Sequence, residues 1–546
     1  MNSFKKMLSV FLAGSLILGI TACGNNQGST QTTTTGVLSS FDEATAPPID
    51  ENAETGTITW LMYEDLLVNA ADLVAKFEAN YKNVEIKQII VGSLDYFDKL
   101  GTLIATGDSP DIVRYEWLSF PHGISYNMYT PIDDYVDFSS DLWKGVADVA
   151  EQFAYNGKHY YAPYSLVDNF SLNYNKLVLE EAGLDDPMEL YLNDEWTWEA
   201  FKDILTKWCN LSEEHIGYTG VGAMSFLATT GTKLVDITSE GEIINNMKNE
   251  NVYRTMDFLQ SLNKEGLIGT GYADPGAAFV DGNLLFLGMQ ASWAFTASKE
   301  GLYKQGIEED MAFIPFPRDA KADKYYHAIG SYGYMIPAGA KNVKGAMDWI
   351  EFNRINETDP EIVAEAEAFA KNDDPIYFPK CSNADCGDTS ENADKNGKHI
   401  FTDEENESGV SVCPVCGTER KPKFHAVYSE QQWEIYQEMK STDGRLSMLF
   451  DNCFGFGKSA DALLNSGAAG DGTDAILNGS LLYGTSYATI CESSFNALES
   501  YIQPYRDRMK ADAEGKPMET TAPVSETATG DSASETAEET SAETAA

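Results

Sequence analysis

The chain has 546 residues, with 38 basic and 85 acidic side chains and a formal net charge of −47. Hydrophobic residues make up 43% and aromatic residues 12%. This excludes a wholly disordered chain, because so much apolar side chain can fill a core. The length predicts about two or three globular units. The negative charge argues against a nucleic-acid partner, which needs a basic surface, and against a polybasic membrane-binding surface.

The first residues have the pattern of an export signal. Lys5 and Lys6 precede an apolar stretch, Met7–Ile20, that is too short to span a bilayer. Small residues then lead directly to Cys23. This resembles a bacterial lipoprotein signal, in which cleavage before the cysteine leaves its thiol to carry a lipid. We therefore expect a signal peptide at 1–22 and an anchor on the outer face of the cell membrane. The alternative is an ordinary signal peptide with a chance cysteine.

Polar segments without apolar periodicity flank the body of the chain. Residues 23–54 are expected to form a flexible tether. Residues 513–546 are expected to form a disordered acidic tail, because the part from Pro517 onward contains seven acids, no base and no aromatic residue. The globular body is therefore expected between these segments.

From Thr57 onward, strand patterns alternate with helical ones. We expect strands at 57–62, 84–87 and 111–115, and helices at 66–81 and 96–105. Gly107 follows as a helix stop. This alternation predicts an α/β unit with a parallel sheet. Because ligands bind at the carboxyl ends of parallel strands, a crevice is expected near Tyr63, Glu64, Glu116 and Trp117.

Five segments, in this order, resemble those of extracellular solute-binding proteins of family 1, the sugar-capturing lipoproteins of ABC importers. They are Gly107–Val113 (GDSPDIV), Tyr155–Pro163 (YNGKHYYAP), Asn173–Leu184 (NYNK followed by EAGL), Trp196–Phe201 (WTWEAF) and Phe279–Trp293. The resemblance covers about residues 57–350, and the order of the segments carries it more than any single one.

The resemblance implies a two-lobed α/β fold of the periplasmic-binding-protein type II, with a hinged cleft. Lobe 1 is expected at 55–150 with a return segment at about 330–375, and lobe 2 at 151–328 with C-terminal helices at about 429–512. The small residues of Gly330–Gly333 suit a strand that crosses between the lobes, although a plain strand and turn explain them nearly as well.

A carbohydrate presents an apolar face, on which aromatic rings stack, and a rim of hydroxyls, which carboxylate and amide groups bind. The resemblance implies the ligand residues Tyr63, Glu64, Tyr115, Glu116, Trp117, Tyr164, Asp168, Asn169, Trp293 and Tyr332. Trp60 and Arg114 lie in the same segments, but Trp60 sits inside a strand and fits the core as well as the cleft.

The resemblance implies a monomeric, lipid-anchored substrate-binding protein without catalytic activity. It would capture a carbohydrate or oligosaccharide and deliver it to the permease subunits of an ABC importer. Two other classes stay open. A cell-surface carbohydrate-active enzyme would use two of the same carboxylates, and a surface interaction platform would bind no small molecule.

Four of the eight cysteines fall in one stretch. Cys381 and Cys386 form one pair, and Cys413 and Cys416 form a second in the run CPVCG. Each pair is followed by glycine, which resembles a zinc ribbon, so we expect an inserted structural zinc site within 376–428. Two disulfides are the alternative in an exported protein. His399 and His425 are less favoured candidates to replace a cysteine as ligand, whereas Cys209, Cys453 and Cys491 are scattered and fit either free thiols or disulfides.

Overall fold

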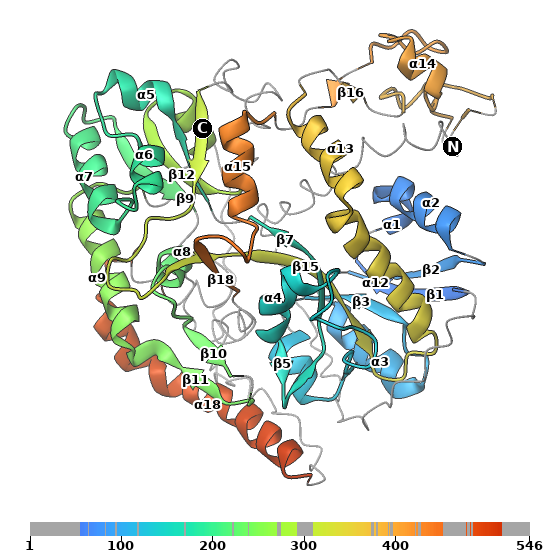
Figure 1. Cartoon of the computed structure of the whole chain (residues 1–546), viewed down its shortest axis with the longest axis horizontal. Coiled ribbons are helices and arrows are strands. Elements are labelled where there is room, and N and C mark those ends of the chain that lie inside the picture. The colour runs from blue at the N-terminus through green and yellow to red at the C-terminus, as the bar shows by residue number, and fades with distance from the viewer. Residues whose placement is uncertain are drawn as a thin grey trace, which may run out of the picture.

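The computed structural model describes the chain from residue 55 to residue 515, apart from internal gaps. The gaps are residues 64, 82, 93–94, 117–118, 169–170, 221–222, 239, 270–274, 292–309, 373–375, 378–379, 391, 394–396, 421, 424–426, 451–476, 478–480 and 482–483. The predicted signal peptide, the lipidation site Cys23, the tether and the tail beyond residue 515 lie outside the described residues. The described part forms two α/β lobes side by side (Figure 1).

The first lobe is built on a six-stranded sheet. In spatial order its strands are β2 (Glu85–Ile90), β1 (Thr57–Met62), β3 (Ile112–Arg114), β15 (Gly330–Pro337) and β4 (Tyr129–Thr130), with β7 (Ala162–Val167) also paired to β15. Strand β1 runs parallel to β2 and β3, as the alternating pattern predicts. Strand β15 runs antiparallel to β3, β4 and β7. Later parts of the chain therefore complete a sheet that the first segments begin.

Helices α1 (Leu66–Asn69), α2 (Ala71–Asn80) and α3 (Tyr96–Thr106) connect the parallel strands. The prediction of one helix over 66–81 is wrong at Ala70, where φ of −129° and ψ of 36° interrupt it. The side chain of Gln88 in β2 accepts a hydrogen bond from the backbone N–H of Leu66 at 2.7 Å. This contact ties α1 to the sheet, and apolar spacing does not encode it. Helix α3 ends at Gly107, which has a φ of 76° and closes the helix as expected.

Helices α12 (Val343–Thr358) and α13 (Pro360–Ala370) follow β15 (Figure 1). Trp60 of β1 is buried against α12, with its ring centroid 5.3 Å from that of Tyr334 and 5.2 Å from that of Trp349. Both ring pairs have the edge-to-face geometry that favours aromatic packing. Trp60 is therefore a core residue, which decides between the two alternatives for this position.

The second lobe is built on a four-stranded sheet, in the order β13 (Met311–Ile314), β8 (Ser171–Asn175), β12 (Leu284–Met289) and β9 (Ile216–Gly220). Its helices include α5 (Lys176–Glu181), α6 (Pro187–Leu192), α7 (Trp198–Cys209), α8 (Ala223–Ala228), α9 (Glu250–Lys264), α10 (Pro275–Val280) and α15 (Glu430–Glu438). Two motif residues cap helices here: Asn175 accepts from the N–H of Val178, and Thr197 accepts from that of Ala200.

Strands β7 and β15 pass between the two lobes and pair with each other (Figure 1). The expected crossing strand at Gly330–Gly333 is the first half of β15. The pairing register shifts between Tyr332 and Gly333, so the strand is irregular at this point. A second connection is the pair of parallel strands β14 (Tyr325–Ala328) and β18 (Leu446–Leu449). Near β18, Gln152 accepts a hydrogen bond from the backbone N–H of Phe450 at 2.9 Å.

Helix α18 (Tyr487–Ala513) contacts both lobes and runs along the lower edge of the molecule (Figure 1). In its first half, the hydroxyl of Tyr487 donates to the backbone oxygen of Met247, next to α9, at 2.9 Å. In its second half, the guanidinium of Arg508 lies 3.9 Å from the ring centroid of Tyr126 in the first lobe. The hydroxyl of Tyr155 also donates to the backbone oxygen of Met509. This helix is therefore a further link between the lobes.

Acid is expected to weaken the fold through His122, which lies against α18. Its Nδ1 is 2.9 Å from the hydroxyl oxygen of Tyr505, and burial together with the positive charge of Arg508 lowers the pKa of His122 to about 4. In an unfolded chain this pKa is about 6.5. Between these two pH values the unfolded state binds more protons, so stability falls as pH falls. The expected loss is about 3 kcal/mol, complete below the folded-state pKa.

Urea unfolding of the wild type and of His122→Gln between pH 7 and pH 4 measures this effect. The wild type should lose about 3 kcal/mol more than the variant over that range. The matched control is His215→Gln, at a half-buried histidine that stacks on Trp208. Equal losses in the wild type and His122→Gln would show that His122 does not carry the pH dependence.

The chain between α13 and α15 leaves the body of the protein and returns to the same place. At the base, the backbone N–H of Tyr428 donates to the oxygen of Ala370 at 2.8 Å. Further out, the short strands β16 (Ile376–Tyr377) and β17 (Pro422–Lys423) pair antiparallel, and the excursion contains helix α14 (Asp403–Glu407). It extends beyond α13 at the upper right of Figure 1. Within the described ranges, no helix is both long and apolar enough to cross a membrane.

Candidate ligand site

A cluster of polar and aromatic side chains lies at the carboxyl ends of β1 and β3, next to the crossing strands. At its centre, Arg114 donates from Nη2 to the hydroxyl of Tyr63 at 2.9 Å, and its Nε is 3.6 Å from Oε1 of Glu116. The guanidinium carbon lies 5.5 Å from the ring centroid of Tyr63 and 6.0 Å from that of Tyr332. Three side chains, from the ends of β1 and β3 and from β15, thus meet around the cation of Arg114.

Tyr164 extends the cluster along the crossing strands. Its ring stacks on Tyr332 and on Tyr334, with centroids 6.4 Å and 5.2 Å away. Burial raises the pKa of Tyr164, and it raises that of Tyr334 to about 12. These hydroxyls therefore stay protonated at neutral pH and can donate hydrogen bonds. The structure brings together four of the predicted ligand residues, Tyr63, Glu116, Tyr164 and Tyr332, and adds Arg114 at their centre.

This cluster is only partly buried. The side chain of Arg114 keeps 26% of its surface exposed and that of Glu116 keeps 16%, while Tyr63, Tyr164 and Tyr332 are all half-buried. Flat rings, a guanidinium and a carboxylate in such a setting can stack on an apolar ligand face and bind its polar rim. The arrangement therefore suits the binding of a polar, partly apolar small molecule.

Tyr115 follows β3 but lies in a different environment. Its ring centroid is 5.0 Å from that of Phe153, 5.1 Å from that of Tyr161 and 6.2 Å from that of Phe450. These centroid separations are typical of aromatic rings that pack against one another. Tyr115 is half-buried, and its assignment as a ligand residue stays a prediction.

Asp168 follows β7 and is fully buried. Its Oδ1 lies 3.7 Å from Nε2 of His327, which is also buried, so the carboxylate does not face solvent. Its negative charge acts on Tyr436, whose pKa is raised mainly by burial and further by Asp168 and Glu357. As a ligand residue, Asp168 also stays a prediction, and its described contacts are those of a buried polar group. Glu64, Trp117, Asn169 and Trp293 lie outside the described residues.

Comparison with known proteins decides the family. A family model described as bacterial extracellular solute-binding protein matches residues 72–363, more than half of the chain. The chain belongs to the bacterial extracellular solute-binding proteins. No curated protein sequence matches it. As the family is extracellular, its members act outside the cytoplasm.

Solved structures of solute-binding proteins share the fold. The sugar-binding protein MalE of Xanthomonas citri is 13% identical, with a TM-score of 0.53, over 84% of this chain and 98% of that chain. A family 1 extracellular solute-binding protein of Bifidobacterium longum subsp. infantis is 15% identical, with a TM-score of 0.53, over 83% of this chain and 100% of that chain. A sugar transporter of Rhizobium etli in an open conformation is 16% identical, with a TM-score of 0.53, over 81% and 99%. The predicted two-lobed α/β fold is therefore confirmed.

Sequence reasoning about this solute-binding protein missed the central place of Arg114. Arg114 is the last residue of β3, and its side chain is flanked by two tyrosines that are far apart in the sequence. The one signal was a cation at the carboxyl end of an apolar strand, Ile112-Val113-Arg114, where ligands meet parallel sheets. Nothing in the sequence near Arg114 indicates that Tyr332 would join it.

Proposed function

We propose that this solute-binding protein captures a carbohydrate or oligosaccharide between its lobes and delivers it to the membrane permease of an ABC importer. One observation carries the proposal: the half-buried cluster of Tyr63, Arg114, Glu116 and Tyr332 next to the crossing strands. The tyrosine rings suit the apolar C–H face of a sugar ring, and the guanidinium and carboxylate suit its hydroxyls. The names of two fold relatives, a sugar-binding protein and a sugar transporter, support the same class of ligand.

In this proposal the solute acts by differential binding. Groups of the cluster come from the carboxyl ends of β1 and β3 in the first lobe and from the crossing strand β15. A solute that contacts both lobes stabilises the closed arrangement relative to the open one. The size of this stabilisation equals the difference between the binding free energies of the solute for the two arrangements. No bond of the solute is made or broken. The closed form is then the one that the permease would recognise.

The chain is further proposed to be a monomer held on the outer face of the cell membrane by a lipid on Cys23. The support is the sequence pattern of its first residues, a basic start, a short apolar stretch and small residues before the cysteine. A flexible tether over residues 23–54 would let the lobes reach a permease in the same membrane. The partners are thus a small solute, the permease subunits and the lipid bilayer.

The enzyme alternative is less well supported. A glycosidase needs two carboxyl groups that face the sugar. Of the predicted carboxylates that the structure describes, Glu116 is next to Arg114 and partly exposed, whereas Asp168 is buried beside His327. We therefore propose that the chain has no catalytic activity.

A thermal-shift screen of the mature chain, residues 23–546, tests the proposal with monosaccharides, oligosaccharides, amino acids, peptides and polyamines. A solute at about 100 times its dissociation constant adds about 2.7 kcal/mol of stability, which raises the melting temperature by a few degrees. A shift with a carbohydrate whose chromatogram stays unchanged after incubation is the expected result. Glycan cleavage would favour the enzyme, and a screen without any shift would favour the surface platform.

A further inference from the structure

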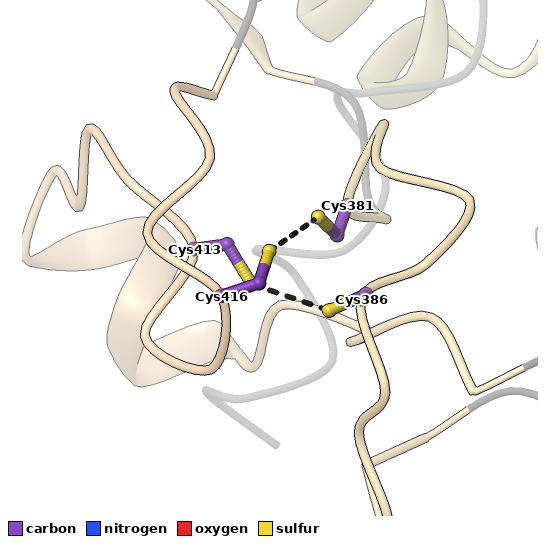
Figure 2. A group of neighbouring side chains, drawn as sticks. All are labelled: Cys381, Cys386, Cys413 and Cys416. Carbon is purple, nitrogen blue, oxygen red and sulfur yellow. Dashed lines mark hydrogen bonds between the residues drawn. The ribbon is translucent and has the colours of Figure 1, made fainter.

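The four cysteines of the excursion come together in space. Figure 2 shows Cys381, Cys386, Cys413 and Cys416 pointing toward a common centre. All four Sγ atoms lie within 4.8 Å of one another. Two contacts join the two halves of the motif: the Sγ atoms of Cys381 and Cys416 are 3.5 Å apart, and those of Cys386 and Cys413 are 3.7 Å apart. Cysteines that are 35 and 27 positions apart in the sequence thus meet at one point.

These distances fit a tetrahedral metal site better than disulfides. Four sulfurs at about 2.3 Å from one zinc ion are about 3.8 Å apart in a regular tetrahedron. A disulfide needs about 2.05 Å between its two sulfur atoms. Two separate disulfides would also not require all four sulfur atoms to lie close together. All four cysteines are free thiols in the structure, and three of them are buried. Four thiolates in a closed tetrahedral set select zinc or iron, and leave no position open for catalysis.

The turns around the sulfurs have the shape that holds a thiolate. The backbone N–H of Asn383 points at Sγ of Cys381, with 3.4 Å between N and S. Sγ of Cys416 lies 3.2 Å from Oγ1 of Thr418, where a thiolate would accept from the hydroxyl. Gly417 has a φ of 71° and donates its N–H to the oxygen of Cys413 at 2.8 Å, which closes the turn between the second pair. Hydrogen-bond donors thus face the sulfurs.

A histidine that could compete as a ligand is held elsewhere. Nδ1 of His399 is 2.6 Å from Oδ2 of Asp388, and its Nε2 is 3.2 Å from both carboxylate oxygens of Glu405. Both ring nitrogens therefore have carboxylate partners, so the prediction of His399 as a substitute ligand is not supported. His425 lies outside the described residues. The ligand set is four sulfurs.

The excursion needs such a site because its own core is very small. Among the described residues of the excursion, the buried apolar cluster consists of Phe401 and three of the cysteines, Cys381, Cys386 and Cys413. Val412 and Val415, beside the second pair, are about half exposed, with 47% and 45% of their surface accessible. So little buried apolar surface does not hold a segment of this size together, and small modules of this kind depend on a metal or on disulfides.

We propose that Cys381, Cys386, Cys413 and Cys416 bind one structural Zn²⁺, and that this ion holds the excursion as a folding unit separate from the two lobes. The base of the excursion supports the second part. Besides the backbone bond between Ala370 and Tyr428, Lys371 bridges Glu367 and Glu430 across the point of exit and return, at 2.6 Å and 2.7 Å. These contacts join α13 to α15 without the excursion. Loss of the metal should therefore unfold the excursion and leave the two lobes folded.

The test is the metal content of the purified full-length chain, measured by elemental mass spectrometry after dialysis against buffer without chelator. The expected result is about one zinc per chain for the wild type and for Cys209→Ser, a control at a free, half-buried thiol outside the excursion. Cys413→Ser is expected to lose at least nine-tenths of the zinc. Cobalt substituted into the wild type should show the charge-transfer bands of a tetrahedral cobalt–thiolate site.

A second readout covers the case in which Cys413→Ser does not fold. In the wild type, a strong chelator should expose the four cysteines to alkylation and residues 380–420 to proteolysis, without a shift in the melting temperature of the lobes. Absence of zinc in the wild type, bound iron in its place, or two disulfides found by peptide mass mapping would each overturn the zinc assignment. A fall in the melting temperature of the lobes on chelation would overturn the separate folding unit.

Discussion

Replacing Asp111 by alanine is expected to lower the free energy of unfolding by roughly 4 kcal/mol. The buried carboxylate of Asp111 accepts three backbone hydrogen bonds. Its Oδ2 accepts from the N–H of Thr59 at 2.8 Å, and its Oδ1 accepts from those of Lys341 and Asn342 at 2.9 Å and 2.7 Å. Bonds to a charged acceptor contribute about 1.5–3 kcal/mol each, offset in part by the burial of the charge. The alanine variant would leave three N–H groups without this acceptor.

Urea unfolding of Asp111→Ala, Asp111→Asn and the wild type measures this effect. The asparagine variant keeps one acceptor oxygen and loses the bond to Thr59, so it should lie between the other two. Asp108→Ala is the matched control in the same segment, because the side chain of Asp108 is 74% exposed. An Asp111→Ala midpoint equal to that of the control would contradict the structural role of this carboxylate.

Gly333→Ala is the second substitution with a large expected effect, a loss of about 2–3 kcal/mol. A Cβ atom at this position would lie 2.4 Å from Cε2 of Tyr161 and 2.5 Å from the backbone oxygen of Ala162. The ring of Tyr161 is held by the hydrogen bond from its hydroxyl to Oγ of Ser331 at 2.9 Å. Neither neighbour can give way without moving β7 against β15, the two strands that cross between the lobes.

Thermal unfolding compares Gly333→Ala with Gly444→Ala. At Gly444 an added Cβ meets only Cγ of Glu438, at 3.5 Å, which is an ordinary contact, and the backbone is not left-handed. The control should therefore unfold like the wild type. If Gly333→Ala does the same, β7 and β15 are not packed as closely as the structure places them.

The segments that indicated the family are mostly structural in this protein. Gly107 closes α3, Asp111 joins β1 to the start of α12, and Asn175 and Thr197 cap helices. Asn156 adopts a left-handed backbone conformation in the hairpin turn between β5 (Ala154–Tyr155) and β6 (Lys158–His159). Of these roles only the helix stop at Gly107 was predicted from the sequence, whereas the two-lobed fold was predicted from the resemblance that the order of the segments carries.

The site could be predicted only in part, because it depends on contacts between distant segments. The carboxyl ends of β1 and β3 were predictable from the alternation of strands and helices, and with them Tyr63 and Glu116. The approach of Tyr332 to Arg114 joins residues more than 200 positions apart and follows from the path of β15. The burial of Asp168 beside His327 also depends on a contact between distant segments.

Helix α18 shows the same limit at the level of the fold. Its sequence predicts a C-terminal helix but not that its two ends rest on different lobes. The break at Ala70 is a smaller case, because a continuous apolar spacing runs through a position where the backbone leaves the helical conformation. Local patterns identify elements, whereas tertiary contacts decide where they end and what they join.

Binding of the carbohydrate found in the screen to the wild type and to Tyr332→Ala, measured by titration calorimetry, tests the central claim most directly. Loss of one stacking ring is expected to weaken binding by about 2 kcal/mol, or roughly 30-fold. Tyr326→Ala, which removes a half-buried ring of β14 outside the cluster, should bind like the wild type. If Tyr332→Ala stays folded and binds with wild-type affinity, the solute does not bind at this cluster.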